Sequence, residues 1–243
     1  MKAIETQALT KKYGNKIAVD SLELSVESGE LFALLGVNGA GKTTTIKMLS
    51  CLCKPTEGEA LLLGQSVLTQ QQEIKSFINV SPQETAVAPK LTVEENLQLI
   101  CGIYGMKKPE AKAKAGETIK EFGMEEIAKD RAATLSGGWQ RRLSIAMALI
   151  TDPKILFLDE PTLGLDVLAR RELWDMIRKL KGRVTVILTT HYLEEAEALS
   201  DRIGIMVKGK LCAVGTAKEL MERTKADKFE DAFVTIAEEG ATK

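Results

Sequence analysis

The sequence is poor in residues that build metal centres. Its 243 residues include one histidine and four cysteines, of which Cys51 and Cys53 are separated by a single residue. That spacing is wrong for the usual metal-binding or redox pair, and one histidine is too few for an ordinary zinc site. We therefore expect no zinc site, and we expect free thiols rather than disulfides.

A strong net charge is also lacking. Lysine and arginine together number 33, and aspartate and glutamate number 34, so the formal charge is −1. A protein held mainly by general attraction to nucleic acid would be basic. We expect no nucleic-acid partner, although this balance leaves room for a local basic patch.

Long apolar runs are absent as well. The apolar stretches Leu31–Leu35 and 184–188 are far shorter than the ~20 residues that a membrane-spanning helix needs. Residues 1–6 alternate polar and apolar side chains and lack the apolar core of a signal peptide. Any role at a membrane would therefore depend on a partner protein.

The clearest motif present is a glycine-rich loop at residues 36–43, Gly-Val-Asn-Gly-Ala-Gly-Lys-Thr. It follows the strand-like stretch Leu31–Leu35 and precedes a helical pattern, which is the context that a phosphate-binding loop requires and an ordinary glycine turn does not. In such loops backbone N–H groups surround phosphates, the lysine reaches the β- and γ-phosphates, and the threonine hydroxyl ligates Mg²⁺. The expected ATP contacts here are Gly36, Asn38, Gly39, Ala40, Gly41, Lys42, Thr43 and Thr44.

A second motif places two carboxylates at the end of a strand. Residues 155–160 read Ile-Leu-Phe-Leu-Asp-Glu, and ligands of open α/β sheets bind at the carboxyl ends of strands. Alone, this pattern would indicate an ordinary acidic turn; beside a phosphate loop it indicates the edge of a nucleotide site. We expect Asp159 to hold Mg²⁺ through water and an ionised Glu160 to polarise the attacking water, with the metal offsetting the repulsion between the carboxylates.

A second helix start also has the properties of an anion site. Residues 135–142 read Leu-Ser-Gly-Gly-Trp-Gln-Arg-Arg and open a helical pattern that continues through residue 149. Free backbone N–H groups, the positive end of the helix dipole and the hydroxyl of Ser136 would all point forward. One nucleotide site does not need two phosphate-binding helix starts, so this segment requires a separate explanation.

The order of elements predicts an α/β fold. We expect a P-loop NTPase core with a mainly parallel sheet, an N-terminal antiparallel β subdomain and an inserted α-helical subdomain. The antiparallel strands fall within residues 1–27, one of them over 17–26. In the insertion, Thr92-x-x-Glu95 forms a capping box.

The boundaries follow from the same patterns. Helices are expected from the capping box to residue 104, over 109–122 and over 124–129, with no strand signals among them. We assign one domain to the whole chain: residues 1–90 and 132–220 form the catalytic core, residues 91–131 the helical subdomain, and residues 221–243 a helical tail.

In combination the motifs point to one family. The phosphate loop, residues 135–138 and Asp159-Glu160-Pro161, in that order, resemble the nucleotide-binding subunit of ABC transporters, and the resemblance covers about residues 3–220. In that family two ATP-binding domains pack head to tail, with each ATP between the phosphate loop of one chain and the Ser-Gly-Gly helix start of the other. The resemblance would therefore explain the second anion site.

The resemblance implies roles for four further residues. Tyr13 matches the aromatic residue that stacks on adenine, and Gln83 matches the loop glutamine that senses Mg²⁺ and the γ-phosphate. Asp166 matches the loop at the dimer centre, and His191 matches the switch histidine that contacts the γ-phosphate. Without the resemblance they would be interpreted as a turn tyrosine, a solvated glutamine, a helix N-cap and a structural histidine.

The resemblance also implies which residues catalyse hydrolysis, which hold the metal and which contact the partner's ATP. The expected catalytic residues are Lys42, Glu160 and His191. The expected metal ligands are Thr43, Gln83 and Asp159. The expected contacts to ATP bound by the partner chain are Ser136, Gly137, Gly138 and Gln140.

The implied function is hydrolysis of ATP, with Mg²⁺, in a nucleotide-sandwich dimer that drives transport. The partners would be a second ATPase subunit and a permease in a separate chain, and the protein would lie at the cytoplasmic face of the cell membrane. Export is favoured because Arg141-Arg142, the compact length and residues 229–233 look like the ATPases of multidrug or antibiotic efflux.

Two alternatives are weaker. Non-transport ABC-type ATPases of translation, repair or chromosomes usually carry long coiled-coil insertions or two ATPase domains, and this sequence has neither. A small-molecule kinase with a phosphate loop would not explain residues 135–138 or Glu160. The sequence departs from the family pattern at Trp139, Leu163 and Val167, none of which removes a catalytic group.

Overall fold

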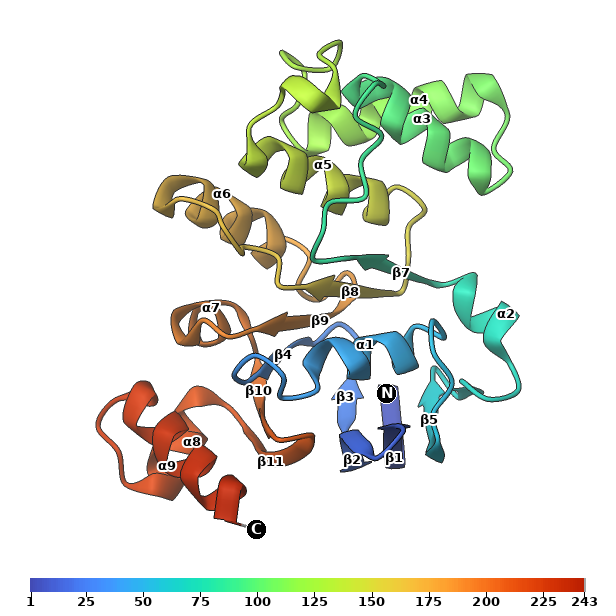
Figure 1. Cartoon of the computed structure of the whole chain (residues 1–243). Coiled ribbons are helices and arrows are strands. Elements are labelled where there is room, and N and C mark those ends of the chain that lie inside the picture. Colours follow the sequence, from blue (N-terminus) through green and yellow to red (C-terminus); the bar gives the residue numbers. More distant parts are fainter. Residues whose placement is uncertain (243) are drawn as a thin grey trace.

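Two β-sheets and the helices around them make up the fold (Figure 1), which a computed structural model describes over residues 1–242. The strands of the larger sheet are β4 (Leu31–Leu35), β7 (Ile78–Ser81), β8 (Ile155–Asp159), β9 (Thr185–Thr190), β10 (Arg202–Val207) and β11 (Lys210–Gly215). Their order is β11-β10-β4-β9-β8-β7, and every neighbouring pair except β10–β11 is parallel. The sheet is therefore mainly parallel, as the sequence predicts.

The smaller sheet is antiparallel and is built mostly from the N-terminal part of the chain. Its strands are β1 (Lys2–Tyr13), β2 (Lys16–Leu22), β3 (Ser25–Glu27), β5 (Glu57–Leu62) and β6 (Gln65–Ser66). The order is β2-β1-β5-β6, with β3 also paired to β1. The expected single strand over 17–26 is wrong, because the hydroxyl of Thr6 donates to the Leu22 carbonyl at 2.7 Å and accepts from the Leu24 N–H at 2.8 Å, which interrupts the strand pairing.

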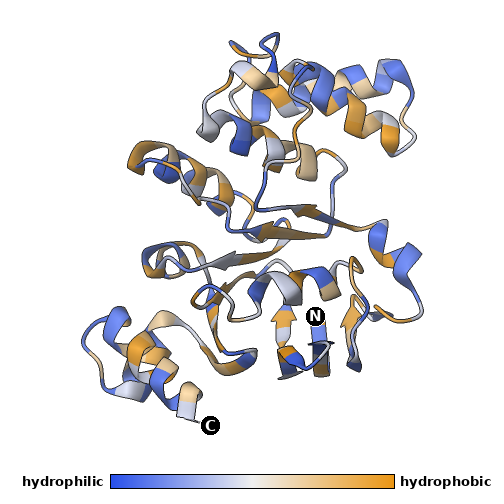
Figure 2. Cartoon of the chain, viewed as in Figure 1, coloured by the Kyte–Doolittle hydropathy of each residue, from blue (hydrophilic) through white to orange (hydrophobic). Residues whose placement is uncertain are grey.

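Strand β4 lies between two hydrophobic cores. All five of its residues are buried. Leu31, Ala33 and Leu35 belong to one core, while Phe32 and Leu34 belong to the other. A parallel strand covered on both faces is expected to be an uninterrupted apolar run, and Figure 2 shows the central strands mostly in hydrophobic colours.

Helices cover both faces of the larger sheet. They are α1 (Lys42–Leu49), α2 (Gln71–Lys75), α3 (Val93–Ile103), α4 (Lys108–Glu121), α5 (Gly137–Leu149), α6 (Val167–Arg178), α7 (Leu193–Leu199), α8 (Ala217–Thr224) and α9 (Phe229–Thr242), with a 3₁₀ turn at Ala132–Thr134. Helix α1 packs in the core shared by the two sheets, and α5, α6 and α7 pack in the core on the opposite face. The short helices α2 and α7 were not expected from the sequence.

Helices α3 and α4 lie in the segment without strand signals. The capping box is confirmed: Glu95 N–H donates to the Thr92 hydroxyl at 3.2 Å, and Thr92 N–H donates to the Glu95 carboxylate at 2.8 Å. The expected helix over 124–129 is wrong. There the Asp130 N–H bonds to the Ile127 carbonyl three residues back, which makes separate turns instead of a helix.

The proposed division of the chain stays a prediction. The helices of 91–131 interrupt the strands of 1–90 and 132–220, and α8 and α9 bring the chain to Thr242. The last residue of the assigned tail, Lys243, lies outside the described residues. Among residues 1–242, no helix has both the length and the apolar character needed to cross a membrane.

Candidate functional site

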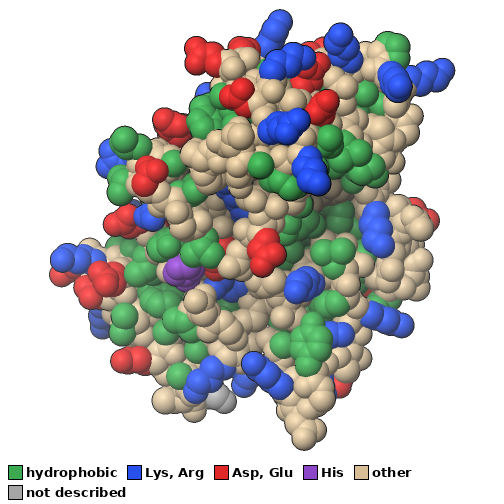
Figure 3. All heavy atoms as spheres, turned by 45° about the horizontal axis from the view of Figure 1, so that its top comes forward, with side chains coloured by type: hydrophobic (Ala, Val, Ile, Leu, Met, Phe, Trp, Pro, Cys, Tyr) green, Lys and Arg blue, Asp and Glu red, His purple; other side chains and the backbone are tan. Residues whose placement is uncertain are grey.

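A cavity of about 420 Å³ opens beside the glycine-rich loop, near the carboxyl ends of β4, β8 and β9. It is lined by Tyr13, Lys16, Ala18, Asn38, Gly39, Ala40, Gly41, Lys42, Thr43, Thr44, Gln83, Glu160, Leu163 and His191. These residues come from segments far apart in the sequence, and they include most of the residues that we expect at the ATP and its phosphates. Figure 3 shows the single histidine (purple) at the surface, beside basic and acidic side chains.

Two glycines of the loop are required by close backbone approach. A Cβ atom at Gly36 would lie 2.4 Å from the Met206 carbonyl oxygen, and one at Gly41 would lie 2.5 Å from the Ala18 carbonyl oxygen. Gly41 also has a φ of +106°, which side-chain-bearing residues rarely adopt. The loop can therefore turn directly from β4 into α1 against its neighbours only with glycine at these positions.

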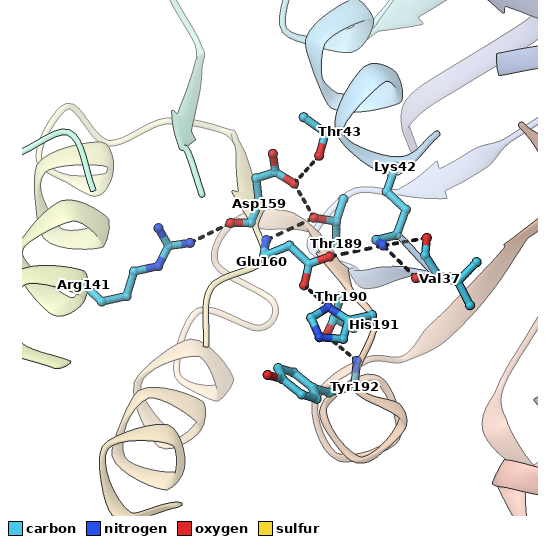
Figure 4. A network of polar contacts seen from close by, with 11 residues as sticks. Val37, Lys42, Thr43, Arg141, Asp159, Glu160, Thr189, Thr190, His191 and Tyr192 are labelled. Atoms are coloured by element: carbon cyan, nitrogen blue, oxygen red, sulfur yellow. Dashed lines mark hydrogen bonds and ion pairs between the residues drawn. The ribbon is translucent and has the colours of Figure 1, made fainter. Parts of the chain in front are cut away.

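The carboxylate of Glu160 lies between two cationic or ionisable side chains. Its Oε1 is 3.1 Å from Lys42 Nζ, and its Oε2 is 2.7 Å from His191 Nδ1 (Figure 4). Lys42 also donates to the Gly36 carbonyl at 2.7 Å. Lys42 and Glu160 are 5% and 6% exposed, so the pair interacts where solvent screens it little.

Asp159 points to the start of α1. Its Oδ1 accepts hydrogen bonds from the Thr43 hydroxyl at 3.1 Å and from the Thr189 hydroxyl at 2.5 Å. Together with the Gln83 amide at the cavity wall, this set offers hydroxyl, carboxylate and amide oxygens. Oxygen ligands of these kinds fit Mg²⁺.

The backbone of Glu160 is strained. Its φ is +47°, in a region that costs a non-glycine residue on the order of 1–3 kcal/mol. The Glu160 N–H donates to the carbonyl and to the hydroxyl of Thr189, both at 3.1 Å. Such strain persists only where surrounding contacts hold it, and it is typical of functional sites.

Sequence reasoning missed the role of Arg141. This side chain is 4% exposed and donates to the carbonyls of Asp159 and Pro161, both at 2.8 Å, and to those of Pro82 and Gln83. Burial lowers its pKa to about 10, against the opposing effect of nearby carboxylates. Arg141 therefore remains a cation at neutral pH. Nothing in the Arg141-Arg142 pair signals which arginine is buried.

Glu195 is a second buried residue that the sequence did not single out. It is fully buried in α7, four residues after His191, and its Oε1 accepts from Trp174 Nε1 at 3.1 Å. Burial raises the pKa of this carboxyl group, and the charge of Glu160 acts in the same direction. Glu195 thus links α6 to the segment that carries the histidine.

The second helix start lies apart from the cavity. Ser136 is the N-cap of α5 and accepts from the Trp139 N–H at 3.4 Å. Ser136 and Gly137 are exposed, and the hollow beside Ser136 and Gly138 measures only about 50 Å³. Gln140 donates to carbonyls of its own chain, at Ala132 (3.0 Å) and Leu135 (3.3 Å).

The remaining expected residues and departures lie around these two regions. Asp166 is the N-cap of α6 and accepts from the N–H groups of Leu168 at 2.9 Å and Ala169 at 3.0 Å. Leu163 is 41% exposed at the cavity, and Val167 is 63% exposed at the first turn of α6. Whether Asp166 lies at a dimer centre stays a prediction.

A strand, a glycine-rich loop and a helix that begins with a lysine and a threonine, both in contact with strand-end carboxylates beside a cavity, define a P-loop nucleotide-binding protein. A family model described as "ABC transporter" matches residues 19–163. The chain belongs to the ABC transporter family, which confirms the resemblance and the fold class predicted from the sequence.

Similar proteins agree with this assignment. The chain is 40% identical over 240 residues to "Probable multidrug ABC transporter ATP-binding protein YbhF" of Escherichia coli (strain K12), covering 96% of this chain and 41% of that protein. It therefore spans about two fifths of that relative's length. It is 39% identical over 240 residues to "Daunorubicin resistance ATP-binding protein DrrA3" of Streptomyces coeruleorubidus, covering 98% of this chain and 76% of that protein.

A solved structure supports the fold. It is described as the dimeric structure of a post-hydrolysis state of an ATP-binding cassette bound to ADP and Pi. It matches with a TM-score of 0.78 and 28% identity over 88% of this chain and 98% of that chain.

Proposed function

We propose that this chain is the ATP-hydrolysing subunit of an ABC transporter of the drug-export type. The observation that carries the proposal is the Glu160 carboxylate, which lies between Lys42 and His191 at the wall of the cavity. A buried carboxylate beside a phosphate-binding lysine is suited to orient a water molecule and accept its proton. The names of the relatives, which refer to multidrug and drug-resistance systems, support export.

The bound nucleotide would be held along the cavity. The exposed ring of Tyr13 would stack on the adenine, and the N–H groups of residues 36–43 would surround the phosphates. Thr43, Asp159 and Gln83 would hold Mg²⁺, which when bound neutralises phosphate charge. Lys42 and His191 would both contact the γ-phosphate, while Glu160 would activate the attacking water.

We further propose that two chains complete the site. The helix start at Ser136 is exposed and the hollow beside it is too small for a nucleotide. In a head-to-tail dimer, Ser136, Gly137, Gly138 and Gln140 would meet the γ-phosphate of ATP bound to the partner chain. The dimeric state of the ADP-bound cassette, whose fold this chain shares, supports the arrangement.

The transported molecule would cross through a permease in a separate chain. This protein would then lie at the cytoplasmic face of the cell membrane, where ATP is available, and would attach there through its partner. An affinity-tagged chain isolated from detergent-solubilised membranes should bring such a membrane protein with it.

The first test is ATP hydrolysis by the purified chain with and without Lys42. The wild-type chain should release phosphate from ATP in a Mg²⁺-dependent reaction. Lys42→Ala should lower the rate by about 100-fold or more, because the lysine supplies charge stabilisation that no neighbouring group replaces. The measurement is steady-state phosphate release.

Lys47→Ala is the matched control. Lys47 is an exposed lysine on the same helix, α1, and its loss should change the rate less than about twofold because exposed charges contribute little. Equal activity of the Lys42→Ala and wild-type proteins would refute the assignment of the phosphate site.

A further inference from the structure

We propose that Arg141 is a positioning residue for hydrolysis, which fixes the peptide around Glu160 and the loop of Gln83 relative to helix α5. This inference rests on the proposed function. It concerns a residue that does not line the nucleotide cavity and that would act through the groups it holds.

The first support is the pattern of hydrogen bonds around Glu160. Arg141 Nη2 donates to the carbonyl of Asp159, and Arg141 Nε donates to the carbonyl of Pro161, both at 2.8 Å. These carbonyls flank Glu160 on either side along the chain. A planar guanidinium can hold two acceptors in a fixed relative position, whereas an ammonium group acts as a point charge.

The second support is the strained backbone between those two carbonyls. Glu160 has a φ of +47°, which requires external contacts to persist. On one side the Thr189 hydroxyl and carbonyl accept from the Glu160 N–H. Arg141 holds the carbonyls before and after Glu160, and the Leu163 N–H donates to the Glu160 carbonyl at 3.2 Å. Arg141 thereby fixes the backbone from which the Glu160 carboxylate reaches Lys42 and His191.

The third support is the loop that follows β7. Arg141 Nη1 donates to the carbonyl of Pro82 and, at 3.4 Å, to the carbonyl of Gln83. Gln83 itself lines the nucleotide cavity. One buried cation therefore joins the ends of β7 and β8 to α5.

Helix α5 gives these contacts a consequence for the dimer. Ser136 is the N-cap of α5, and Arg141 lies about 7.5 Å further along the axis of the same helix. The partner chain would bring a γ-phosphate to Ser136 and thereby fix the position of α5. Arg141, in the next turn of α5, orients the backbone of Glu160. Engagement of one ATP would thus be linked to alignment of the carboxylate that acts on the other ATP.

Arg141→Lys in the purified chain tests the inference. The variant keeps the charge but cannot hold carbonyls on both sides of Glu160. We expect kcat per nucleotide-binding chain to fall about 10- to 100-fold, because misplacement of a catalytic group by ~1 Å can cost about 10²-fold. KM for ATP, and the Kd and stoichiometry of ATP binding by titration calorimetry, should change less than about threefold.

Arg141→Gln is a second variant, needed because a misplaced ammonium group in Arg141→Lys could itself destabilise the protein. Glutamine removes the buried charge and so avoids that cost. Its kcat should fall in the same way. Arg183→Gln is the matched control: Arg183 is an exposed arginine that pairs with Glu121 of α4 at 3.1 Å, and its loss should leave kcat within about twofold.

The outcomes separate the inference from the proposed function. A wild-type chain that does not hydrolyse ATP would refute the proposed function and the inference with it. An active wild type, together with folded Arg141 variants of unchanged kcat, would refute the inference alone. The Arg141 variants could instead have a lower Tm and fewer chains that bind nucleotide, but an unchanged kcat per binding chain. Arg141 would then only stabilise the fold, and the inference would be overturned as well.

Discussion

Helices α1 and α5 both have glycine and a hydroxyl residue at or beside their N-caps, yet their surroundings differ. The loop before α1 is packed against Met206 and Ala18 and opens on a cavity of about 420 Å³. The start of α5 is exposed, and the hollow beside it measures about 50 Å³. A helix N-terminus alone therefore offers N–H groups and a dipole, but the walls around it decide whether a ligand can bind.

The two helix starts also differ in the charged side chains beside them. Lys42 stands in the first turn of α1 and faces the cavity, beside Glu160. The first turn of α5 holds no such cation: Arg141 is turned inward to carbonyls, and Arg142 pairs with Glu172 at 2.8 Å. The first helix start therefore has a cation for phosphate, and the second has none; in the proposed dimer, the second would complete the site of the partner chain.

The largest expected effect comes from Glu160→Gln, which should disable the first site without emptying it. Removing a general base costs about 10²- to 10⁴-fold in rate, and the amide keeps nearly the same volume. We expect kcat to fall by that amount while ATP binding changes only a few-fold. The ATP-bound variant should also accumulate as a dimer, detected by size-exclusion chromatography with light scattering.

Glu194→Gln is the control for that variant, since Glu194 is an exposed carboxylate in the first turn of α7. Its hydrolysis rate should match that of the wild type. Hydrolysis by Glu160→Gln near the wild-type rate would contradict the role assigned to this carboxylate.

Local spacing explains what could be predicted from the sequence. The phosphate loop depends on residues 36–43 and the elements on either side, so its pattern is readable without long-range contacts. The approach of Glu160 to Lys42 follows from a general rule, because parallel strands present their carboxyl ends at one edge of the sheet. These predictions needed no knowledge of side-chain packing.

Long-range contacts explain what could not be predicted. Arg141 and Arg142 are identical neighbours, but one is buried against the ends of β7 and β8 and the other pairs at the surface. Similarly, β2 ends at Leu22, where the hydroxyl of Thr6, on another strand, bonds to the Leu22 carbonyl and to the Leu24 N–H. The helix expected over 124–129 is replaced by turns, and carbonyls of this segment pair with another part of the chain: those of Ala128 and Asp130 accept from the N–H groups of Glu94 and Val93 at 3.0 and 3.1 Å.

A smaller effect than that of Glu160→Gln should come from Ser136→Arg, which places a bulky cation at the exposed helix start. Hydrolysis should fall about tenfold or more, because the side chain would obstruct docking of the partner's nucleotide. ATP binding by the monomer should not change, since Ser136 does not line the cavity. Phosphate release is measured at concentrations where the wild type dimerises.

Mixing variants distinguishes a site shared between chains from a site within one chain. In a head-to-tail dimer of Lys42→Ala and Ser136→Arg chains, one of the composite sites carries both defects and the other is intact. If chains pair at random, half of the dimers are mixed and each has one intact site, so an equimolar mixture should recover activity up to about a quarter of the wild-type value. No recovery from two folded, dimerising variants would mean that Ser136 does not act on the partner's nucleotide.

The smallest effects are expected from removing the N-cap side chains of α6 and α5. They compare a cap that holds its own helix with a cap that remains available to a ligand. Asp166 accepts from two N–H groups of α6 at 2.9 and 3.0 Å, whereas Ser136 accepts from one N–H of α5 at 3.4 Å. Asp166→Ala should therefore cost about 1 kcal/mol of unfolding free energy, or about 2–4 °C in Tm, and Ser136→Ala should cost less. Thermal unfolding without nucleotide measures both, and Asp166→Asn, which keeps a capping oxygen, should recover most of the loss. If Ser136→Ala were the more destabilising change, the Ser136 hydroxyl would be committed to its own helix, and its proposed availability to a partner's phosphate would lose its structural basis.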